Sequence, residues 1–274
     1  MSTRRIPPAP TGTGPRPLDP WSPLRQLTPA RIALGRAGVS LPTARHLEFQ
    51  IAHARARTAV HSELDIAALQ SALGPTAAQL LPVTSQAPDR ATYLQRPDLG
   101  RRLAPDSAET LRAARSETVP DLAPDLAIVL ADGLSALATQ SSAPPFLAAL
   151  TPRLREAGLR LAPLTVATQA RVALGDKIAQ ALGARMVMVL IGERPGLSAA
   201  DSLGLYLTWN PRDDSTDADR NCLSNIRPGG LSFEDAAHRA AYLAREAMRL
   251  QLSGVGLKDR TETITGDATP DRIA

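Results

Sequence analysis

From residue 126 to residue 254, short apolar runs alternate with longer helical stretches, and this alternation is the feature that most constrains the fold. Residues 145–158 and 175–184 are helical stretches between the first three runs, and residues 233–254 form a long closing helix. Such alternation is typical of a parallel sheet joined by right-handed crossovers. We therefore expect a Rossmann-like, mostly parallel sheet flanked by helices over residues 106–258. The predicted strands lie in residues 126–135, 159–167, 185–193, 203–211 and 221–226.

The preceding residues 24–105 are rich in Ala, Leu and Arg and predict a helical subdomain. In its longest helix, Leu47, Ile51 and Ala54 follow one another at spacings of four and three, which indicates an apolar stripe. The first helix is bounded by Thr28 and Pro29 at its beginning and by Gly38 at its end, the second begins at Thr43, and the third ends at Gly74. The predicted helices cover residues 28–38, 43–64 and 66–74.

Both ends of the chain have compositions that do not support a packed core. Residues 1–23 contain seven of the 24 prolines, which predicts a disordered, Pro-rich tail. Residues 259–274 are polar and are expected to form a loose C-terminal tail.

Charge and composition exclude several classes of protein. The net charge is +4, without a run of five or more like charges, and aromatic residues make up 3% of the chain. A nucleic-acid-binding protein is therefore not expected. No apolar run approaches the ~18 residues that span a membrane, and no secretory signal follows the N-terminus. A single cysteine, Cys222, excludes an internal disulfide and fits a reducing compartment. We expect a cytoplasmic protein.

Motifs for common catalytic chemistry are missing. The sequence contains no GxxxxGK[ST], no HExxH and no GxSxG, and no GxGxxG follows a predicted strand. His46 and His53 share a helix face but lie two turns apart, about 10.5 Å along the axis, which is too far to chelate one metal ion. We expect no metal site.

Three polar peptides follow or form predicted strands, where open α/β sheets bind ligands. Asp132–Ser135 is either a ligand-facing turn or an ordinary Asp-Gly turn with a serine cap. In the peptide 192–197, Glu193 and Arg194 follow the most apolar strand. They are either groups that bind a ligand or an ion pair in a surface turn. The peptide 220–226 is too polar for an ordinary strand and is either ligand-facing or an irregular edge strand. Cys222, within it, is either inert and buried, the commonest state of a free cysteine, or a catalytic thiolate, which would need a base that the nearby sequence does not contain.

Seven peptides, in their order along the chain, carry a resemblance to a known family. They are ARIALGRAGVSLPT, YLQRPDLGRRL, ADGLSA, RVALGDKIAQALGA, VLIGERPGLSAADSLG, DRNCLSNIRPGGL and SGVGLKD. This order is that of the small subunit of ethanolamine ammonia-lyase, and the resemblance covers residues 24–258.

The resemblance implies a subunit of an adenosylcobalamin-dependent lyase that converts ethanolamine to acetaldehyde and ammonia. It implies a hetero-oligomer with a large TIM-barrel subunit that carries the substrate site. The small chain then contributes cofactor contacts and no catalytic residue or metal ligand. Carried over to this sequence, the cobalamin contacts are Val172, Glu193 and Cys222. From the sequence alone, Val172 would be assigned to the core.

Two further expectations concern the cofactor and the location. No histidine lies two residues after an aspartate, so the Asp-x-His motif that replaces the cofactor's own base is missing, and base-on cobalamin is expected. Some relatives enter a bacterial microcompartment through an N-terminal helix, but residues 1–23 contain too much Pro and Gly to form one. Location in a microcompartment therefore stays open.

Two alternative functions also remain. One is a stand-alone α/β enzyme that uses Glu193 or Cys222 catalytically, although neither has a base nearby in sequence. The other is a non-enzymatic assembly protein that docks through residues 28–105.

Overall fold

The computed structural model describes residues 19–28, 30–77, 80–117 and 123–261. Most of the predicted Pro-rich tail and nearly all of the predicted C-terminal tail lie outside these residues. The chain divides into two units, residues 1–52 and 53–274. The domain boundaries predicted at residues 23, 105 and 258 stay predictions.

In the first unit, the described residues contain a short 3-10 helix, η1 (Ser22–Gln26), and the first half of α1 (Thr43–His61). The helix predicted over residues 28–38 does not form. Gly35 and Gly38 adopt positive φ, and so does Ala33, so the backbone turns instead of continuing a helix. Along α1, the side chains of Leu47 and Ile51 are 50% and 54% exposed. The predicted apolar stripe is therefore not buried in the structure.

The second unit is built on a mixed six-stranded sheet in the order β1-β3-β2-β4-β5-β6. The first four strands in this order are parallel, and β5 and β6 are antiparallel to their neighbours. The α/β class is confirmed, whereas the Rossmann-like description and the helical N-terminal subdomain are not. The strands are β1 (Leu80–Thr84), β2 (Leu126–Ala131), β3 (Leu164–Thr168), β4 (Met186–Gly192), β5 (Leu203–Trp209) and β6 (Arg220–Ile226).

The burial and the direction of the strands follow from their sequences and from the segments that connect them. Strands β2 and β4 are buried along their whole length, as expected for apolar runs in the parallel centre of a sheet. No helix separates β4 from β5 or β5 from β6, apart from the 3-10 turn η4 (Asp217–Asp219). A connection without a crossover helix returns the chain antiparallel.

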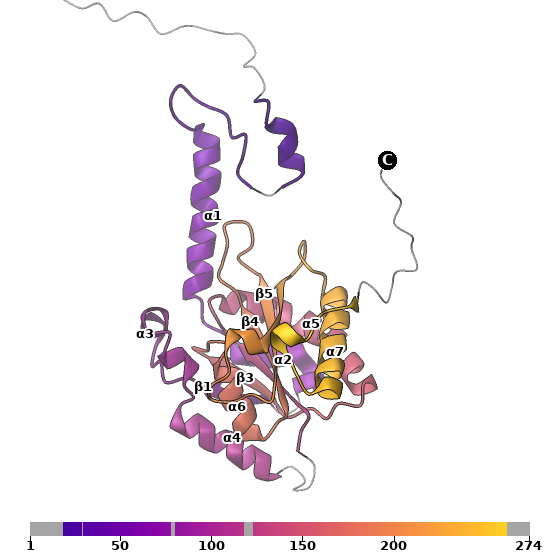
Figure 1. Cartoon of the computed structure of the whole chain (residues 1–274). Helices are drawn as coiled ribbons and strands as arrows, with labels where there is room; N and C mark the ends of the chain where they lie inside the picture. Colours follow the sequence, from indigo (N-terminus) through magenta and orange to yellow (C-terminus); the bar gives the residue numbers. More distant parts are fainter. Residues whose placement is uncertain (1–18, 29, 78–79, 118–122, 262–274) are drawn as a thin grey trace, which may run out of the picture. The chain divides into compact units, whose positions relative to one another are not determined.

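Helices cover both faces of the parallel strands (Figure 1). On one face, α5 (Ala136–Glu156) packs beside α7 (Phe233–Leu250). On the other, α6 (Leu174–Leu182) packs on β2 and β4, and α4 (Pro105–Glu117) packs on α6 and β1. Two buried apolar clusters, one on each face, form the core.

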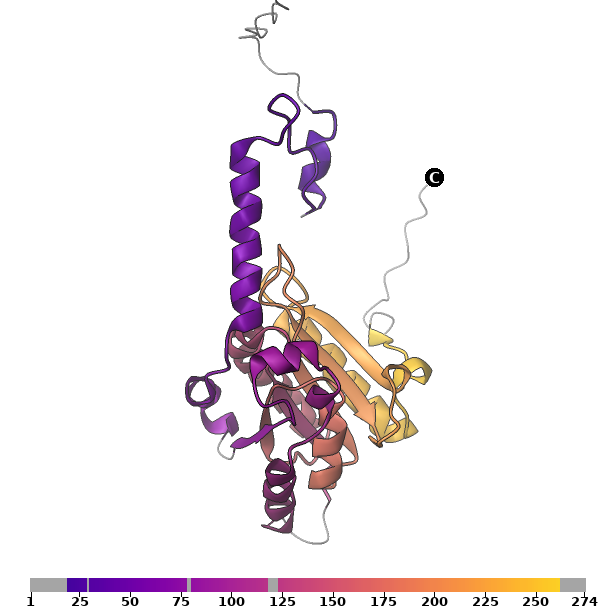
Figure 2. The same cartoon turned by 90° about the vertical axis from the view of Figure 1, so that its left-hand side faces the viewer.

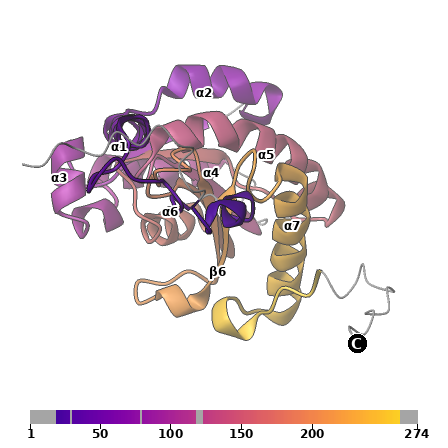
Figure 3. The same cartoon turned by 90° about the horizontal axis from the view of Figure 1, so that it is seen from above.

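Smaller helices complete the unit. In Figure 3, α2 (Ile66–Leu73) lies against the outer side of α5, as their contacts also show. Helix α3 (Arg90–Gln95) and the 3-10 turn η3 (Leu99–Arg101) follow β1. Two further 3-10 turns are η2 (Gly74–Ala77) and η5 (Gly254–Gly256). Within the described ranges, none of the helices is both long and apolar enough to cross a membrane.

The antiparallel end of the sheet is covered differently. The helices that pack on β5 and β6 are α5 and α7, which lie on the same face. In Figure 2, the orange strands of this end lie in front of α7. The opposite face, which includes Tyr206 and Cys222, therefore has no packed helix comparable to α6 among the described residues.

Candidate functional site

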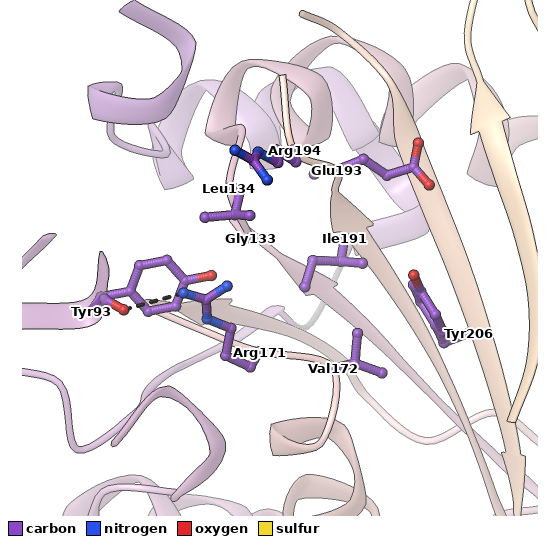
Figure 4. A pocket seen from close by; sticks show the side chains of 10 residues that line it. Tyr93, Gly133, Leu134, Arg171, Val172, Ile191, Glu193, Arg194 and Tyr206 are labelled. Atoms are coloured by element: carbon purple, nitrogen blue, oxygen red, sulfur yellow. Dashed lines mark hydrogen bonds between the residues drawn. The ribbon is translucent and has the colours of Figure 1, made fainter. Parts of the chain in front are cut away.

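A cavity of about 440 Å³ lies at the carboxyl ends of β2, β3 and β4 (Figure 4). This is the edge at which open α/β sheets bind ligands. Its walls come from five segments that are far apart in the sequence: helix α3, the loops after β2 and β3, the end of β4, and β5. The lining residues are Tyr93, Gly133, Leu134, Arg171, Val172, Ile191, Gly192, Glu193, Arg194 and Tyr206.

The floor of this cavity is formed by two backbone segments in direct contact. The amide of Leu134 donates a hydrogen bond to the carbonyl oxygen of Gly192 at 2.9 Å. A Cβ atom on Gly133 would lie 2.2 Å from that oxygen, and one on Gly192 would lie 1.9 Å from the carbonyl oxygen of Ser135. Both glycines are therefore required for this approach. Ser135 caps α5 by accepting a hydrogen bond from the amide of Ala138, as the sequence predicted.

Asp132 lies at the end of β2 but serves the fold. Its carboxylate accepts hydrogen bonds from the amides of Gln169 and Ala170, at 2.8 and 3.0 Å. It also lies 3.4 Å from the guanidinium of Arg90. Burial raises the pKa of Asp132, and these hydrogen bonds oppose the rise. The side chain of Asp132 thus joins the ends of β2 and β3, whereas Gly133 and Leu134 of the same peptide line the cavity.

Glu193 begins in the cavity wall and extends over β5 towards β6 (Figure 4). Its Oε2 accepts hydrogen bonds from the hydroxyl of Ser202, at 2.5 Å, and from the amide of Asn225, at 3.2 Å. Gly204 provides the space, because a Cβ atom there would lie 2.9 Å from Oε1. Among the described residues, none donates a hydrogen bond to Oε1. Glu193 is therefore held in place with one carboxylate oxygen available to a ligand.

Cys222 lies opposite Tyr206 in the β5–β6 register. The cysteine is exposed and does not line the cavity, but its neighbour across the strand pair, Tyr206, does. Burial by the surrounding protein raises the pKa of the Cys222 thiol, and the charge of Glu193 adds to this rise. Cys222 and Glu193 thus belong to one surface around Tyr206.

Of the three residues predicted as contacts, Val172 and Glu193 line the same cavity. Val172 is half-buried at its rim and also packs against the core cluster beneath α6, so the core assignment made from the sequence alone is only partly correct. Sequence reasoning did not find Tyr93, Arg171 or Tyr206 as site residues. The signal available was the scarcity of tyrosine, because two of the three tyrosines in the chain line this cavity.

A second cavity, of about 570 Å³, continues from the first and shares Arg171, Val172 and Tyr206 with it. It extends to the loop before β6, where Arg220 and Asp176 form a buried ion pair. The two cavities together form one elongated cleft, which we call the carboxyl-edge cleft. No group of three His, Cys, Asp or Glu side chains suited to a metal ion occurs in the part of the chain that the structure describes.

The fold and the carboxyl-edge cleft define an open α/β sheet protein with a candidate ligand site at the ends of its parallel strands. The profile of the ethanolamine ammonia-lyase light chain (EutC) family matches residues 18–258. The chain therefore belongs to this family.

Curated relatives agree with this assignment, and each is described as an ethanolamine ammonia-lyase small subunit. One from Azotobacter vinelandii is 59% identical over 244 residues, which cover 89% of this chain and 90% of the relative. One from Xanthomonas campestris is 56% identical over 246 residues, covering 90% of each chain. One from Pseudomonas fluorescens is 54% identical over 249 residues, covering 91% of this chain and 89% of the relative.

Proposed function

We propose that this chain is the small subunit of an adenosylcobalamin-dependent ethanolamine ammonia-lyase and holds the base-on cofactor in the carboxyl-edge cleft. The observation that carries the proposal is the position of the expected contacts. Val172 and Glu193, more than 20 residues apart in the sequence, line one cavity. Cys222 lies beside this cavity, paired across the strands with Tyr206, which also lines it. The proposed reaction, which the family resemblance implies, is the conversion of ethanolamine to acetaldehyde and ammonia.

The residues present suit this cofactor. A corrin ring carries carboxamides and methyl groups at its edge, so its site needs acceptors, donors and small apolar surfaces together. Glu193 offers Oε1 as an acceptor, and the buried Nε of Arg171 has no hydrogen-bond partner in the part of the chain that the structure describes. Val172 and Cys222 offer small contact surfaces, and the glycine floor allows close approach. When bound, adenosylcobalamin supplies the radical chemistry of the reaction.

In this proposal the chain's own residues bind and orient. Glu193, fixed by Ser202 and Asn225, accepts hydrogen bonds from carboxamide N–H groups. Neither cavity is lined by a histidine, which supports a cofactor that keeps its own base as the lower ligand. No residue of this chain is assigned to ethanolamine, which binds in the large subunit, a TIM barrel by the family resemblance.

Two surfaces support a partner. The face of β5 and β6 that carries Tyr206 and Cys222 has no packed helix comparable to α6 among the described residues, so a ligand on it has protein on one side only. In addition, α1 exposes Leu47, Phe49 and Ile51, at 50%, 43% and 54%. Leu47 and Ile51 are about one turn apart on this helix, and neighbouring exposed apolar side chains of this kind are typical of interfaces. The proposed assembly is a hetero-oligomer with the large subunit. The proposed location is the cytoplasm, either free or enclosed in a bacterial microcompartment, and cell fractionation distinguishes the two.

A mixing experiment tests the proposal. The purified chain should not turn over ethanolamine, and activity should appear when the large subunit of the same organism and adenosylcobalamin are added. Turnover by the small chain alone would favour the stand-alone enzyme and overturn the proposal. Complex formation without cofactor binding or turnover would favour a purely structural assembly role.

A substitution at Glu193 tests whether the cofactor binds in this cleft. Glu193→Ala should raise the apparent cofactor KM of the complex about tenfold, since one desolvated hydrogen bond contributes about 1–2 kcal/mol. An unchanged cofactor KM would remove Glu193 from the site. A cofactor spectrum that shows histidine nitrogen on cobalt would contradict the base-on state.

A further inference from the structure

Among the basic side chains that line the carboxyl-edge cleft, Arg171 is shared by both of its cavities. It follows β3, lines both cavities, and is anchored through its backbone, since its amide donates a hydrogen bond to the carbonyl oxygen of Gly100 at 2.9 Å. Its guanidinium lies over the ring of Tyr93, with Cζ 4.3 Å from the ring centroid. Nη2 donates to the carbonyl oxygen of Tyr93 at 3.3 Å, the contact dashed in Figure 4.

Tyr93 is a fixed platform beneath this guanidinium. Its side chain is fully buried, and its hydroxyl donates a hydrogen bond to the carbonyl oxygen of Ala170 at 3.0 Å. Arg90 also lies over the ring, with Cζ 4.8 Å from the centroid. Gly100 closes the arrangement, because a Cβ atom there would lie 2.9 Å from Cγ of Arg171. The direction of the Arg171 side chain is therefore set by the protein before any ligand binds.

The bonding of this guanidinium is incomplete. Nε of Arg171 is buried, and none of the described residues accepts a hydrogen bond from it. Among the described residues, no carboxylate lies within 4.0 Å of the Arg171 guanidinium. A buried donor without an acceptor is unfavourable, and a charged one is more so. Such a group in a cleft wall, already oriented by its neighbours, is suited to an oxygen acceptor that a ligand brings.

We infer that Arg171 donates hydrogen bonds to an oxygen acceptor of the bound ligand and that Tyr93 is its positioning residue. The inference rests on the proposed function, which makes the ligand adenosylcobalamin. In that molecule the acceptor is a carboxamide oxygen at the corrin edge or a phosphate oxygen of the nucleotide tail, and both present the same chemistry to a guanidinium.

The test measures binding, not turnover. The complex with the large subunit is titrated with adenosylcobalamin, and the bound cofactor is quantified by equilibrium dialysis. Arg171→Met should raise the dissociation constant by about 10- to 100-fold, the range for a lost charged hydrogen bond. Arg171→Lys should recover only part of the affinity, because lysine lacks the planar fork. A dissociation constant unchanged in both variants would overturn the inference.

The matched control is Arg245→Met. Arg245 also lies over a tyrosine ring, with its Cζ 5.7 Å from the centroid of Tyr242, but it lies on α7 and lines neither cavity. This variant should bind the cofactor as the wild type does. Thermal unfolding of each complex shows whether a variant is folded. Equal losses of affinity in folded Arg171 and Arg245 variants would also overturn the inference.

The same titration with adenosylcobinamide, which lacks the nucleotide tail and its phosphate, shows which oxygen of the cofactor accepts the hydrogen bond from Arg171. A loss of affinity in Arg171→Met for both ligands supports the inference with a carboxamide acceptor. A loss for adenosylcobalamin alone supports it with a phosphate acceptor. Failure of the proposed function is distinguishable, because the wild-type complex would then bind neither ligand.

Tyr93 is tested by a double-mutant cycle. If Tyr93 acts through Arg171, Tyr93→Leu should weaken binding in the wild type but add no further loss in the Arg171→Met background. A purely structural effect of Tyr93→Leu would be the same in both backgrounds and would overturn its positioning role. Tyr93→Phe, which keeps the ring, should preserve most of the affinity.

Discussion

Arg220 of β6 and Asp176 of α6 form a bidentate ion pair inside the protein. Nη1 and Nη2 of Arg220 lie 2.8 and 2.7 Å from the two carboxylate oxygens of Asp176. Only 3% of each side chain is exposed. Nη1 also donates to the hydroxyl of Thr208 at 2.9 Å. The pair joins the antiparallel end of the sheet to the helix at the end of the cleft.

Breaking this pair should destabilise the fold strongly. Asp176→Asn leaves the Arg220 charge buried without its partner, and we expect the free energy of unfolding to fall by about 3–5 kcal/mol. Urea denaturation followed by circular dichroism measures this change. The control is Glu246→Gln, which breaks the more exposed pair with Arg249, 63% exposed, and should cost at most about 1 kcal/mol. Equal losses in the two variants would contradict the prediction.

Gly204 should affect cofactor binding more than stability. In Gly204→Ala, the new Cβ atom meets the side chain of Glu193, 2.9 Å from Oε1, and this side chain can rotate away. We expect a cofactor affinity similar to that of Glu193→Ala, with the free energy of unfolding lowered by less than about 1.5 kcal/mol. The double variant should bind no more weakly than Glu193→Ala, and an additive loss would show that Gly204 acts independently.

Gly192 should tolerate no side chain. In Gly192→Ala, the Cβ atom would lie 1.9 Å from the backbone oxygen of Ser135, which cannot move without displacing the start of α5. We expect a loss of more than about 3 kcal/mol, measured by urea denaturation. Gly158→Ala is the control, because Gly158 has a φ of +73° and no atom of the described residues lies within 4 Å of its Cβ position. Backbone strain alone should lower the free energy of unfolding by about 1–2 kcal/mol there.

Cys222 should react slowly although it is exposed. Burial raises the pKa of its thiol above the ordinary 9.0, and the charge of Glu193 adds to this rise. Tyr206 lowers the pKa, but by less than burial raises it. The thiol therefore stays protonated to higher pH than a free cysteine, and the reactive thiolate is scarce at neutral pH. We expect iodoacetamide, with mass-spectrometric detection, to label Cys222 more slowly than free cysteine, at a rate that still rises above pH 9.0.

Two comparisons make the labelling experiment specific to the site. Glu193→Gln removes one cause of the raised pKa and should accelerate labelling. In the complex with the large subunit, adenosylcobalamin should protect Cys222. Labelling that the cofactor does not slow would remove Cys222 from the proposed contacts.

The sequence predicted the central strands well, because their burial on both faces leaves a continuous apolar run, as in Met186–Gly192. It did not predict β1, where Pro82 interrupts five residues. A proline is tolerated there because β1 is one of the two edge strands of the sheet, and only the assembled sheet shows which strands are at its edges. The antiparallel direction of β5 was missed because the pattern of apolar residues does not encode strand direction.

For the site, the sequence indicated residues that are chemically unusual for their position. Glu193 after an apolar strand is such a residue, and the structure places it in the cleft wall. Arg171 and Tyr93 carry no such signal, since an arginine in an Arg-rich chain and a tyrosine in a helix are ordinary. Their significance comes from a stacking distance of 4.3 Å between groups 78 residues apart, which no local pattern contains.

The contact between Leu134 and Gly192 also determines which parts of the cleft can adapt. Its floor is main chain joined by a hydrogen bond, and it contains no rotatable side chain at Gly133 or Gly192. Preorganised surfaces lose little conformational entropy when a ligand binds. Adaptation to different ligands is therefore restricted to the rim, and substitutions there should alter selectivity while the floor stays unchanged.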